Sequence, residues 1–227
     1  MSSQENNRLI NATDFDAVLF DFDGVIANSE PLHVSTKKAT LVAYNIPFTE
    51  EEVSSFQGSP ESHFFEYFAK QNAQDSSQLL TYKRRLFDQG INEIEAIKGA
   101  IPFIRKVNQD KACYLVTSSI KKQMACFIDR LKLNQDFKDF IACDDVNQHK
   151  PHPEPYLTCM KRNKLNPARC LVIEDSPNGV ISGKAAGCFV IGLIGEFSAE
   201  ALLENGADIV VTGYQELTHL FINPFNR

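Results

Sequence analysis

The sequence lacks several features that mark specialised classes of protein. It has no Trp, and no two of its six Cys lie within three residues of each other, which excludes the Cys-x-x-Cys motifs of redox and zinc sites. We interpret the cysteines as small buried hydrophobic residues that stay reduced in a cytosol. No stretch approaches the roughly 18 consecutive apolar residues of a membrane-spanning helix. The sequence therefore predicts a globular protein without a disulfide framework and without a membrane span.

The chain also lacks an excess of positive charge and an apolar segment at its start. Its formal net charge is −6 at pH 7, whereas nucleic acids and anionic membranes favour a basic surface. The first residues are polar and contain no apolar core of a signal peptide, so we expect residues 1–14 to form a loose tail. These absences indicate a cytoplasmic protein, expected to be a monomer, whose partner is a small molecule.

Short apolar segments alternate with amphipathic segments along most of the chain. In 122–133 the apolar residues recur every three or four positions, as on one face of a helix. Another helix is predicted at 177–186, where Ser176 suits the N-cap and Gly187 the stop. This alternation predicts an α/β fold, with a doubly wound, mainly parallel, Rossmann-like sheet between two layers of helices. The expected strands are 17–22, 112–117, 138–143, 169–174, 188–194 and 208–212.

One interval breaks this alternation. Its length of about 70 residues is far too great for a single crossover between two strands. We therefore expect an inserted all-helical cap domain, residues 29–98, on a catalytic core formed by residues 15–28 and 99–227. The helices predicted within the insertion are 31–45, 49–56, 60–72, 76–88 and 91–97.

Polar residues follow the predicted strands where the chain leaves the sheet, and in open α/β sheets that edge binds ligands. Carboxylates gathered there would bind a hard cation such as Mg²⁺, and hydroxyls at a helix start suit a phosphate. A lysine can neutralise both a carboxylate nucleophile and a phosphoryl oxygen. Asp23-Gly24 alone would be an ordinary turn signal, and only the whole set indicates chemistry. The set is Asp21, Asp23, Gly24, Thr117, Ser118, Ser119, Lys150, Glu174, Asp175 and Ser176.

Four short motifs appear in chain order: DFDGV at 21–25, VTSS at 116–119, HKPHPEPY at 149–156 and IEDSPNGV at 173–180. Together they resemble the haloacid dehalogenase-like superfamily of phosphatases and phosphomutases. The helical insertion directly after the first motif is similar to the branch that contains β-phosphoglucomutase and the sugar-phosphate phosphatases. The resemblance covers about residues 16–207, and motifs one, three and four are specific as a set.

The resemblance implies a role for each polar residue of the first motif. Asp21 would be the nucleophile that becomes an aspartyl phosphate, and a ligand of Mg²⁺. Asp23 would be the general acid/base that protonates the leaving alkoxide and then activates water, while its backbone carbonyl contacts the metal. Gly24 is expected beside the bound phosphate. The implied enzyme is a Mg²⁺-dependent phosphatase that acts on a small phosphorylated sugar or polyol.

The later motifs supply the rest of the implied site. Thr117 matches the phosphate-binding hydroxyl residue of the family, with the Ser118 N–H beside it. Lys150 matches the phosphate-binding lysine. Asp175 matches the main metal-ligand acid, and Glu174 would be a second ligand, bound directly or through water.

Some of these polar residues allow two interpretations. His33 could contact the substrate near the hinge, or it could be a packing residue of the first cap helix. Ser118 and Ser119 could be helix caps only. Lys83 and Arg84 belong to the basic run YKRR, which fits a solvated helix face better than a position at the site.

The cap loop 56–64 bears on the type of reaction. Aligned on Gly58, which we expect at the substrate, Glu61 replaces a basic residue that grips a second phosphate in β-phosphoglucomutase. This difference favours a phosphatase over a phosphosugar mutase, which is kept as the alternative. A receiver domain is excluded by the chain order and the insertion, whereas a catalytically silent phosphate-binding protein is a further alternative.

Overall fold

A six-stranded parallel sheet forms the centre of the protein in the computed structural model, which describes residues 12–56 and 61–222. The strand order is β5-β4-β1-β6-β7-β8, so the first strand lies inside the sheet. The predicted α/β fold class is confirmed, although each strand is shorter than expected. The strands are Ala17–Phe20 (β1), Ala112–Val116 (β4), Phe140–Ile141 (β5), Cys170–Glu174 (β6), Phe189–Leu193 (β7) and Ile209–Val211 (β8).

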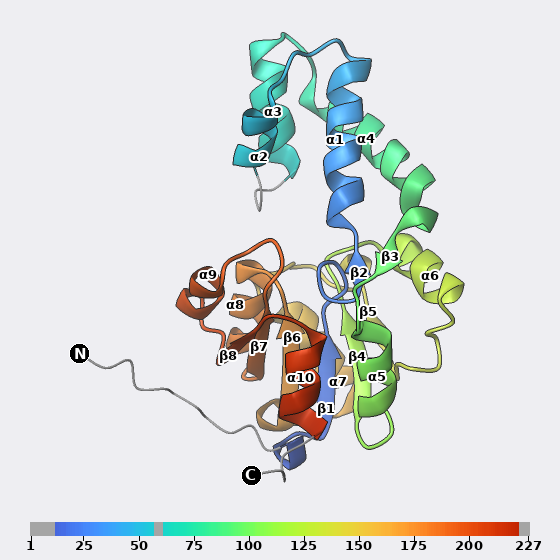
Figure 1. Ribbon diagram of the computed structural model, residues 1–227, viewed down its shortest axis with the longest axis vertical. Coiled ribbons are helices and arrows are strands. Elements are labelled where there is room, and N and C mark those ends of the chain that lie inside the picture. The colour runs from blue at the N-terminus through green and yellow to red at the C-terminus, as the bar shows by residue number, and fades with distance from the viewer. Residues whose placement is uncertain (1–11, 57–60, 223–227) are drawn as a thin grey trace, which may run out of the picture.

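Helices cover both faces of this sheet, because alternate residues of a strand point to opposite sides. Val18 and Phe20 of β1 pack in the layer that contains α5, α6 and α10, whereas Ala17 and Leu19 pack in the layer of α7, α8 and α9. Figure 1 shows α5 and α10 in front of the sheet and α7 behind it. The helices are Ala100–Val107 (α5), Lys121–Arg130 (α6), Glu154–Asn163 (α7), Pro177–Ala185 (α8), Ala199–Glu204 (α9) and Tyr214–Ile222 (α10).

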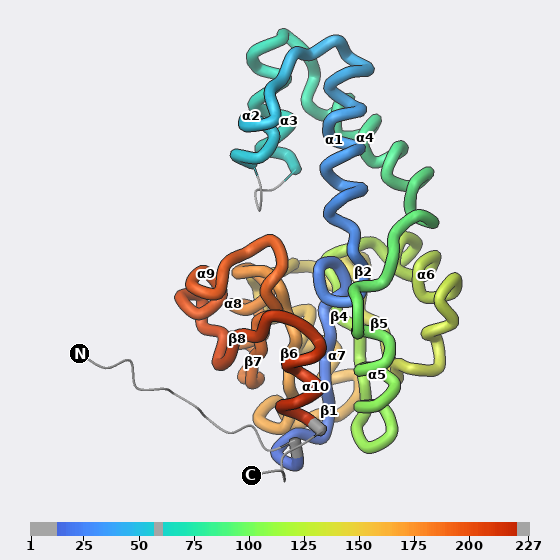
Figure 2. The backbone as a smooth tube through the Cα atoms, viewed as in Figure 1, coloured from blue at the N-terminus to red at the C-terminus, as the bar shows by residue number. Residues whose placement is uncertain are grey.

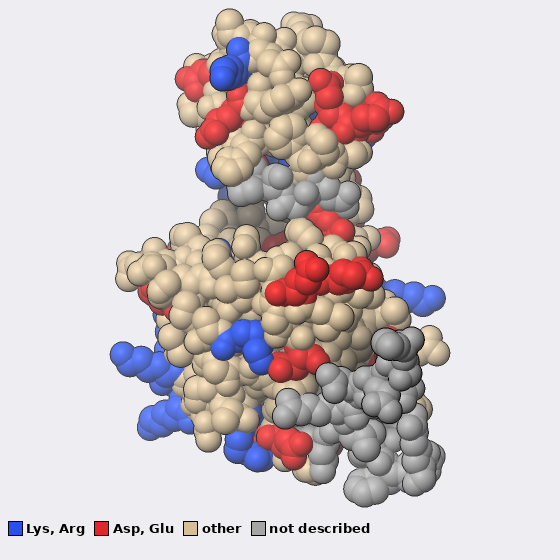
Figure 3. All heavy atoms as spheres, turned by 90° about the vertical axis from the view of Figure 1, so that its left-hand side faces the viewer, with Lys and Arg blue, Asp and Glu red and all other residues tan. Residues whose placement is uncertain are grey.

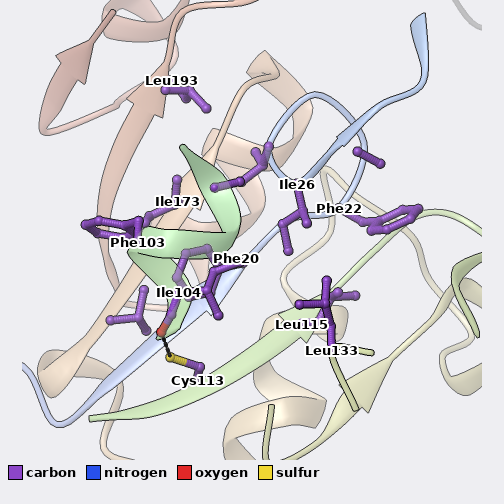
Figure 4. Close-up of a cluster of buried hydrophobic side chains, with 14 of the residues drawn as sticks. Phe20, Phe22, Ile26, Phe103, Ile104, Cys113, Leu115, Leu133, Ile173 and Leu193 are labelled. Atoms are coloured by element: carbon purple, nitrogen blue, oxygen red, sulfur yellow. Dashed lines mark hydrogen bonds between the residues drawn. The ribbon is translucent and has the colours of Figure 1, made fainter. Parts of the chain in front are cut away.

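Aromatic side chains fill the layer on the α5 side. Phe20 meets the rings of Phe103 and Phe137 edge to face, with centroids 6.2 and 6.1 Å away. In Figure 4 the thiol of Cys113 points to the Ile104 carbonyl among these side chains. Cys113 is fully buried, in agreement with its interpretation as a small core residue. This packing fixes the ends of β1 and β4, from which the site residues emerge.

Four helices lie together beyond the carboxyl edge of the sheet (Figure 1). They share an apolar cluster of their own, in which Leu41, Phe64, Phe65 and Phe68 are buried. Thr49 begins the second helix with a capping box, its hydroxyl accepting from Glu52 N and the Glu52 carboxylate from Thr49 N. We call these four the cap helices: Glu30–Ala43 (α1), Glu50–Ser55 (α2), Glu61–Gln71 (α3) and Ser76–Gly90 (α4).

The chain passes to the cap helices and back through two short strands. Ala27–Asn28 (β2) and Glu95–Ala96 (β3) pair antiparallel, and Figure 2 shows these two connections between the parts of the molecule. The predicted helix at 91–97 is therefore wrong. Ile91–Glu93 form a single 3-10 turn, and the chain then extends because Ile94 is buried in the core and β3 pairs with β2.

The start of α8 follows the sequence prediction and faces the candidate site. Its N-cap is Ser176, whose hydroxyl accepts a hydrogen bond from Gly179 N at 3.1 Å. Near the other end of the chain, Ala12–Asp14 form a 3-10 turn within the predicted tail, and Arg169 donates to the Thr13 carbonyl at 3.1 Å. In the described ranges, no helix combines the length and the apolar character needed to cross a membrane.

Candidate active site

Side chains from separate parts of the chain converge above the carboxyl edge of the sheet. Asp21 follows β1 directly, and Asp175 follows β6. A cavity of about 900 Å³ lies between this edge and the cap helices. Figure 3 shows the molecule hollowed between its two parts on the face that it presents. The walls include Asp21, Asp23, Ser118, Lys150 and Asp175 from the core and His33 from α1.

Lys150 connects three of the strand ends, those of β1, β4 and β6. Its Nζ lies 2.6 Å from Asp21 Oδ1 and 2.6 Å from Glu174 Oε1, and it donates to the Val116 carbonyl at 2.9 Å. Burial alone would lower the pKa of Lys150, but the two carboxylates raise it above its usual value. Lys150 therefore stays positively charged at neutral pH and holds Asp21 in place.

The carboxylates are crowded together. Burial raises the pKa of Asp21 to about 8; the charge of Lys150 opposes this shift, and the charges of Glu174 and Asp23 add to it. Burial and the charge of Asp21 likewise raise the pKa of Asp175 well above its usual value. A nucleophilic carboxylate must be ionised, so more positive charge than Lys150 provides is needed here.

Three of the predicted metal ligands form a group that fits this need. Asp21, Glu174 and Asp175 each offer one carboxylate oxygen, and the three atoms lie within 4.8 Å of one another. Hard oxygen donors of this kind suit Mg²⁺. Gly24 permits the approach of Asp175: it has a φ of +73°, and a Cβ there would lie 1.7 Å from Asp175 Oδ2. Gly24 is thus brought to the acid cluster, where only a glycine fits.

Glu174 is the completely buried member of the acid cluster, and sequence reasoning assigned no role to one of its donors, Tyr156. The Tyr156 hydroxyl donates to Glu174 Oε1 at 2.8 Å, and Lys150 Nζ lies 4.9 Å from the centre of the Tyr156 ring. Tyr156 belongs to the HKPHPEPY motif, so its position in the motif was the only signal available. Glu174 and Tyr156 together support Lys150 from below.

The carboxylate of Asp23 is outside the group of three acids. Ser29 donates to Asp23 Oδ1 at 2.6 Å, and Ser119 donates to Oδ2 at 2.5 Å. Sequence reasoning included Ser119 in the polar set at this edge but did not predict its bond to Asp23, and it assigned Ser29 no role. The expected metal contact of Asp23 concerns its backbone carbonyl and stays a prediction.

The loop after β4 carries the hydroxyl residues that were predicted either to bind phosphate or to cap the next helix. Ser118 and Ser119 line the cavity, but α6 begins after Ile120, so neither serine is its N-cap. Thr117 is only 2% exposed, and its Oγ1 accepts from Ser119 N at 2.9 Å. The structure thus brings Ser118 and Ser119 to the cavity wall, with Thr117 supporting the loop that carries them.

Three charged or polar side chains of the cap helices form a cluster of their own. Lys83 of α4 is 2% exposed and contacts the Glu61 carboxylate, while its Nζ lies 2.7 Å from His33 Nδ1. His33 Nδ1 also lies 3.2 Å from Glu61 Oε1, and the His33 ring stacks on Phe87 at 4.3 Å. Burial would raise the pKa of Glu61, but His33 and Lys83 lower it to about 2.

This cluster corrects the sequence interpretation of the basic run YKRR. Lys83 is buried inside the cap helices, whereas Arg84 is exposed as expected of a solvated face. His33 packs on Phe87 and also lines the cavity, and its contact with the substrate stays a prediction. Gly58 lies outside the described residues, so its expected contact with substrate stays a prediction.

The comparison with protein families agrees with the motifs. A family model described as haloacid dehalogenase-like hydrolase matches residues 18–193. The chain belongs to this family. The matched range contains Asp21, Asp23, Lys150 and Asp175, so the converging side chains lie inside the family region. The protein is thus an enzyme of the haloacid dehalogenase-like hydrolase family, as its motifs predicted.

Similar proteins include phosphatases. The phosphorylated carbohydrates phosphatase of Thermotoga maritima is 29% identical over 204 residues, which cover 86% of this chain and 94% of that protein. The validoxylamine A 7'-phosphate phosphatase of Streptomyces hygroscopicus subsp. limoneus is 26% identical over 223 residues, covering 92% and 99%. A solved structure of a provisionally named beta-phosphoglucomutase from Thermotoga maritima has a TM-score of 0.78 and 25% identity, covering 92% and 97%.

Proposed function

We propose that the enzyme is a Mg²⁺-dependent phosphatase that hydrolyses a small phosphorylated metabolite through an aspartyl-phosphate intermediate. One observation carries this proposal: Lys150 bridges Asp21 and Glu174 at 2.6 Å each, beside Asp175 and Asp23, at one wall of a cavity. A positively charged lysine next to a carboxylate and an acid cluster suits a site that receives a phosphoryl dianion.

The proposed reaction uses the two aspartates of the first motif. Asp21, held by Lys150, attacks phosphorus and forms an acyl phosphate while the bond to the leaving oxygen breaks. Asp23 donates its proton to that oxygen, and the alcohol departs. Asp23 then takes a proton from water, which attacks the phosphoryl group and releases phosphate and free Asp21. The hydroxyls of Ser29 and Ser119 orient Asp23 for both steps.

Asp21, Glu174 and Asp175 would hold Mg²⁺, together with the backbone carbonyl of Asp23. When bound, the ion would offset the crowding of negative charge and polarise the phosphoryl oxygens. Two observations support this assignment. One carboxylate oxygen of each of the three acids lies within 4.8 Å of the others, and the pKa of Asp21 is raised. Thr117, the Ser118 N–H and Gly24 would assist in binding phosphate.

Residues 29–98 would act as a cap domain that excludes water and selects the leaving group. Two observations support a small organic substrate: the cavity between cap helices and core has a volume of about 900 Å³, and two similar proteins bear the names of phosphatases of phosphorylated carbohydrates or a 7'-phosphate. A sugar or polyol phosphate is therefore the proposed substrate class. The alternative is a phosphate-binding protein without catalytic activity, which would release no phosphate in an assay.

A phosphosugar mutase is the second candidate, and one contact favours it. Glu61 occupies the position at which β-phosphoglucomutase has a basic residue. Lys83 and His33 compensate the negative charge of Glu61. The repulsion of a second phosphate that the sequence predicted is correspondingly smaller. The name of the similar solved structure from Thermotoga maritima points the same way.

A panel of phosphate monoesters with Mg²⁺, assayed for release of inorganic phosphate, tests the proposal. Asp21→Asn should lower kcat/KM by about 10³-fold or more, as expected for loss of a covalent nucleophile. Asp110→Asn is the matched control, since Asp110 is exposed and lies before β4 at the opposite edge of the sheet. Activity of Asp21→Asn within tenfold of the wild type would contradict the mechanism, and no release from any ester would contradict the function.

A further inference from the structure

A second cavity, of about 340 Å³, adjoins the one at the acid cluster. Its walls combine the first turns of α1 with the start of α8, and Lys37 of α1 lines it on the cap side. Lys37 lies one helical turn after His33, so both point from the same side of α1. The two cavities share Glu30, His33, Ser176, Glu196 and Phe197.

Lys37 is a largely buried cation that makes no hydrogen bond or close ion pair with a carboxylate of the described residues. It is 8% exposed, and among residues 12–56 and 61–222 none accepts a hydrogen bond or an ion pair from its Nζ. Its Nζ lies 5.5 Å from the centre of the Phe64 ring, and its charge also acts on the Glu30 carboxylate without forming a close ion pair. Among the described residues no fully buried side-chain nitrogen lacks a hydrogen-bond partner, so the unpaired Nζ of Lys37 is open to the cavity. A ligand in the cavity can therefore reach its charge.

The other lysines around the cavities are all paired. Lys38, the next residue of α1, lies 2.5 Å from Glu50; Lys83 contacts Glu61; and Lys150 lies between two carboxylates. Among these four lysines, only Lys37 has no carboxylate within ion-pair distance. Its charge is available to a ligand.

The wall opposite Lys37 also favours an anion. Pro177 and Asn178 belong to the first turn of α8, where the Asn178 N–H and the helix dipole carry partial positive charge; Pro177 has no N–H, and Gly179 N donates to the Ser176 hydroxyl. Glu30, Glu61 and Glu196 line the same cavity and oppose an anion, although His33 and Lys83 already compensate the charge of Glu61. Burial and the charge of Glu196 raise the pKa of Glu30, against the opposing effect of Lys37, so its charged form is less favoured there than in water.

We infer that Lys37 is a specificity-determining residue that binds a second oxyanion, a carboxylate or a second phosphate, on the leaving group of the substrate. The inference rests on the proposed function, since the first phosphoryl group lies at Asp21. It narrows the substrate class from phosphorylated sugars and polyols in general to those that carry a further negative group. Phosphorylated sugar acids and bisphosphates have this chemistry.

Matched pairs of substrates test this inference. Glycerol 3-phosphate is compared with 3-phosphoglycerate, which adds a carboxylate, and glucose 6-phosphate with glucose 1,6-bisphosphate, which adds a phosphate. The wild type should prefer the more anionic member of at least one pair. Lys37→Met should lower kcat/KM for that member by about 10- to 100-fold, mainly through KM, because a hydrogen bond to a charged group contributes on the order of 1.5–3 kcal/mol. For the member without the added anionic group, kcat/KM should change less than about threefold. Lys37→Arg should restore part of the preference for the more anionic member.

The control is Lys70→Met, which removes an exposed lysine of α3. Equal losses for both members of each pair would make Lys37 a structural residue, and unchanged kinetics would show that no oxyanion binds there; either result overturns the inference. Calorimetric binding of the same four compounds to Asp21→Asn, with and without Lys37→Met, reads the preference without turnover. If the wild type hydrolyses none of these four, the wider panel of esters decides the proposed function, and the calorimetric comparison still decides the role of Lys37.

Discussion

Ser29 donates a hydrogen bond of 2.6 Å to Asp23, so the residue that precedes the first cap helix holds the proposed general acid/base. Ser29 is 2% exposed and follows β2, at the point where the chain leaves the core. Ser119, from the loop after β4, holds the other oxygen of the same carboxylate. The orientation of Asp23 therefore depends on the hinge as well as on the sheet.

Ser29→Ala should lower kcat about tenfold with a smaller change in KM, because the lost hydrogen bond orients a group that acts in the chemical steps. Ser29→Thr keeps the hydroxyl and should retain most of the activity. Steady-state kinetics of both variants, beside Ser54→Ala on the exposed side of α2, provide the measurement. A Ser29→Ala enzyme with the kcat of the wild type would show that Ser119 alone positions Asp23.

Asp175→Asn should raise the Mg²⁺ concentration for half-maximal activity about tenfold or more, since it removes one charged oxygen from the three-acid group. Excess EDTA should abolish turnover and added Mg²⁺ should restore it. Ca²⁺ should inhibit, because its larger and more variable coordination shell disturbs the alignment of Asp21 with phosphorus. Asp110→Asn should titrate with Mg²⁺ like the wild type. Full turnover in excess EDTA would count decisively against the metal assignment.

Tyr156→Phe should lower the free energy of unfolding by about 1–2 kcal/mol, because Glu174 loses one of its donors in a fully buried position. Urea denaturation followed by circular dichroism measures the difference. Tyr67→Phe is the matched control, since the Tyr67 ring is 39% exposed on α3. Equal stability of the Tyr156 variant and the wild type would mean that Lys150 and the backbone donors satisfy Glu174 by themselves.

The core of the site was predictable because its residues follow strands. Asp21 comes directly after an apolar run, and Asp175 follows another, so parallel strands alone bring them to one edge. Lys150 lies in a loop, and only its place in a motif identified it. The sheet was predictable for the same reason, since buried parallel strands read as continuous apolar segments.

The remaining contacts depend on tertiary structure that no local pattern encodes. Ser119 and Asp23 are 96 residues apart in sequence, and Lys83 and His33 are 50 apart. A basic run on an amphipathic helix gives no indication that one of its lysines turns inward to an acid. The failed helix at 91–97 has a similar cause, because pairing of β3 with β2 overrides the helical tendency of that segment.

The charge around Glu61 bears on hydrolysis versus phosphoryl transfer. A mutase must hold a bisphosphorylated intermediate while it reorients, and its cap then needs cations that can move to the distal phosphate. Lys83 is held between Glu61, His33 and the Phe87 ring at 4.6 Å, so its charge is committed inside the cap helices. Lys37 can hold a second oxyanion, but one cation facing Glu30 and Glu196 does not replace a mobile cationic loop.

We therefore expect water to be the usual acceptor of the phosphoryl group on Asp21. The measurement supplies the enzyme with β-glucose 1-phosphate, Mg²⁺ and a trace of glucose 1,6-bisphosphate, and phosphorus NMR follows glucose 6-phosphate and free phosphate together. Release of phosphate should outpace formation of glucose 6-phosphate, and Asp21→Asn should stop both. Faster formation of glucose 6-phosphate would establish the mutase. In that case Lys37→Met should slow the transfer more than the hydrolysis, because only the transfer requires the second phosphate to stay bound while the intermediate turns.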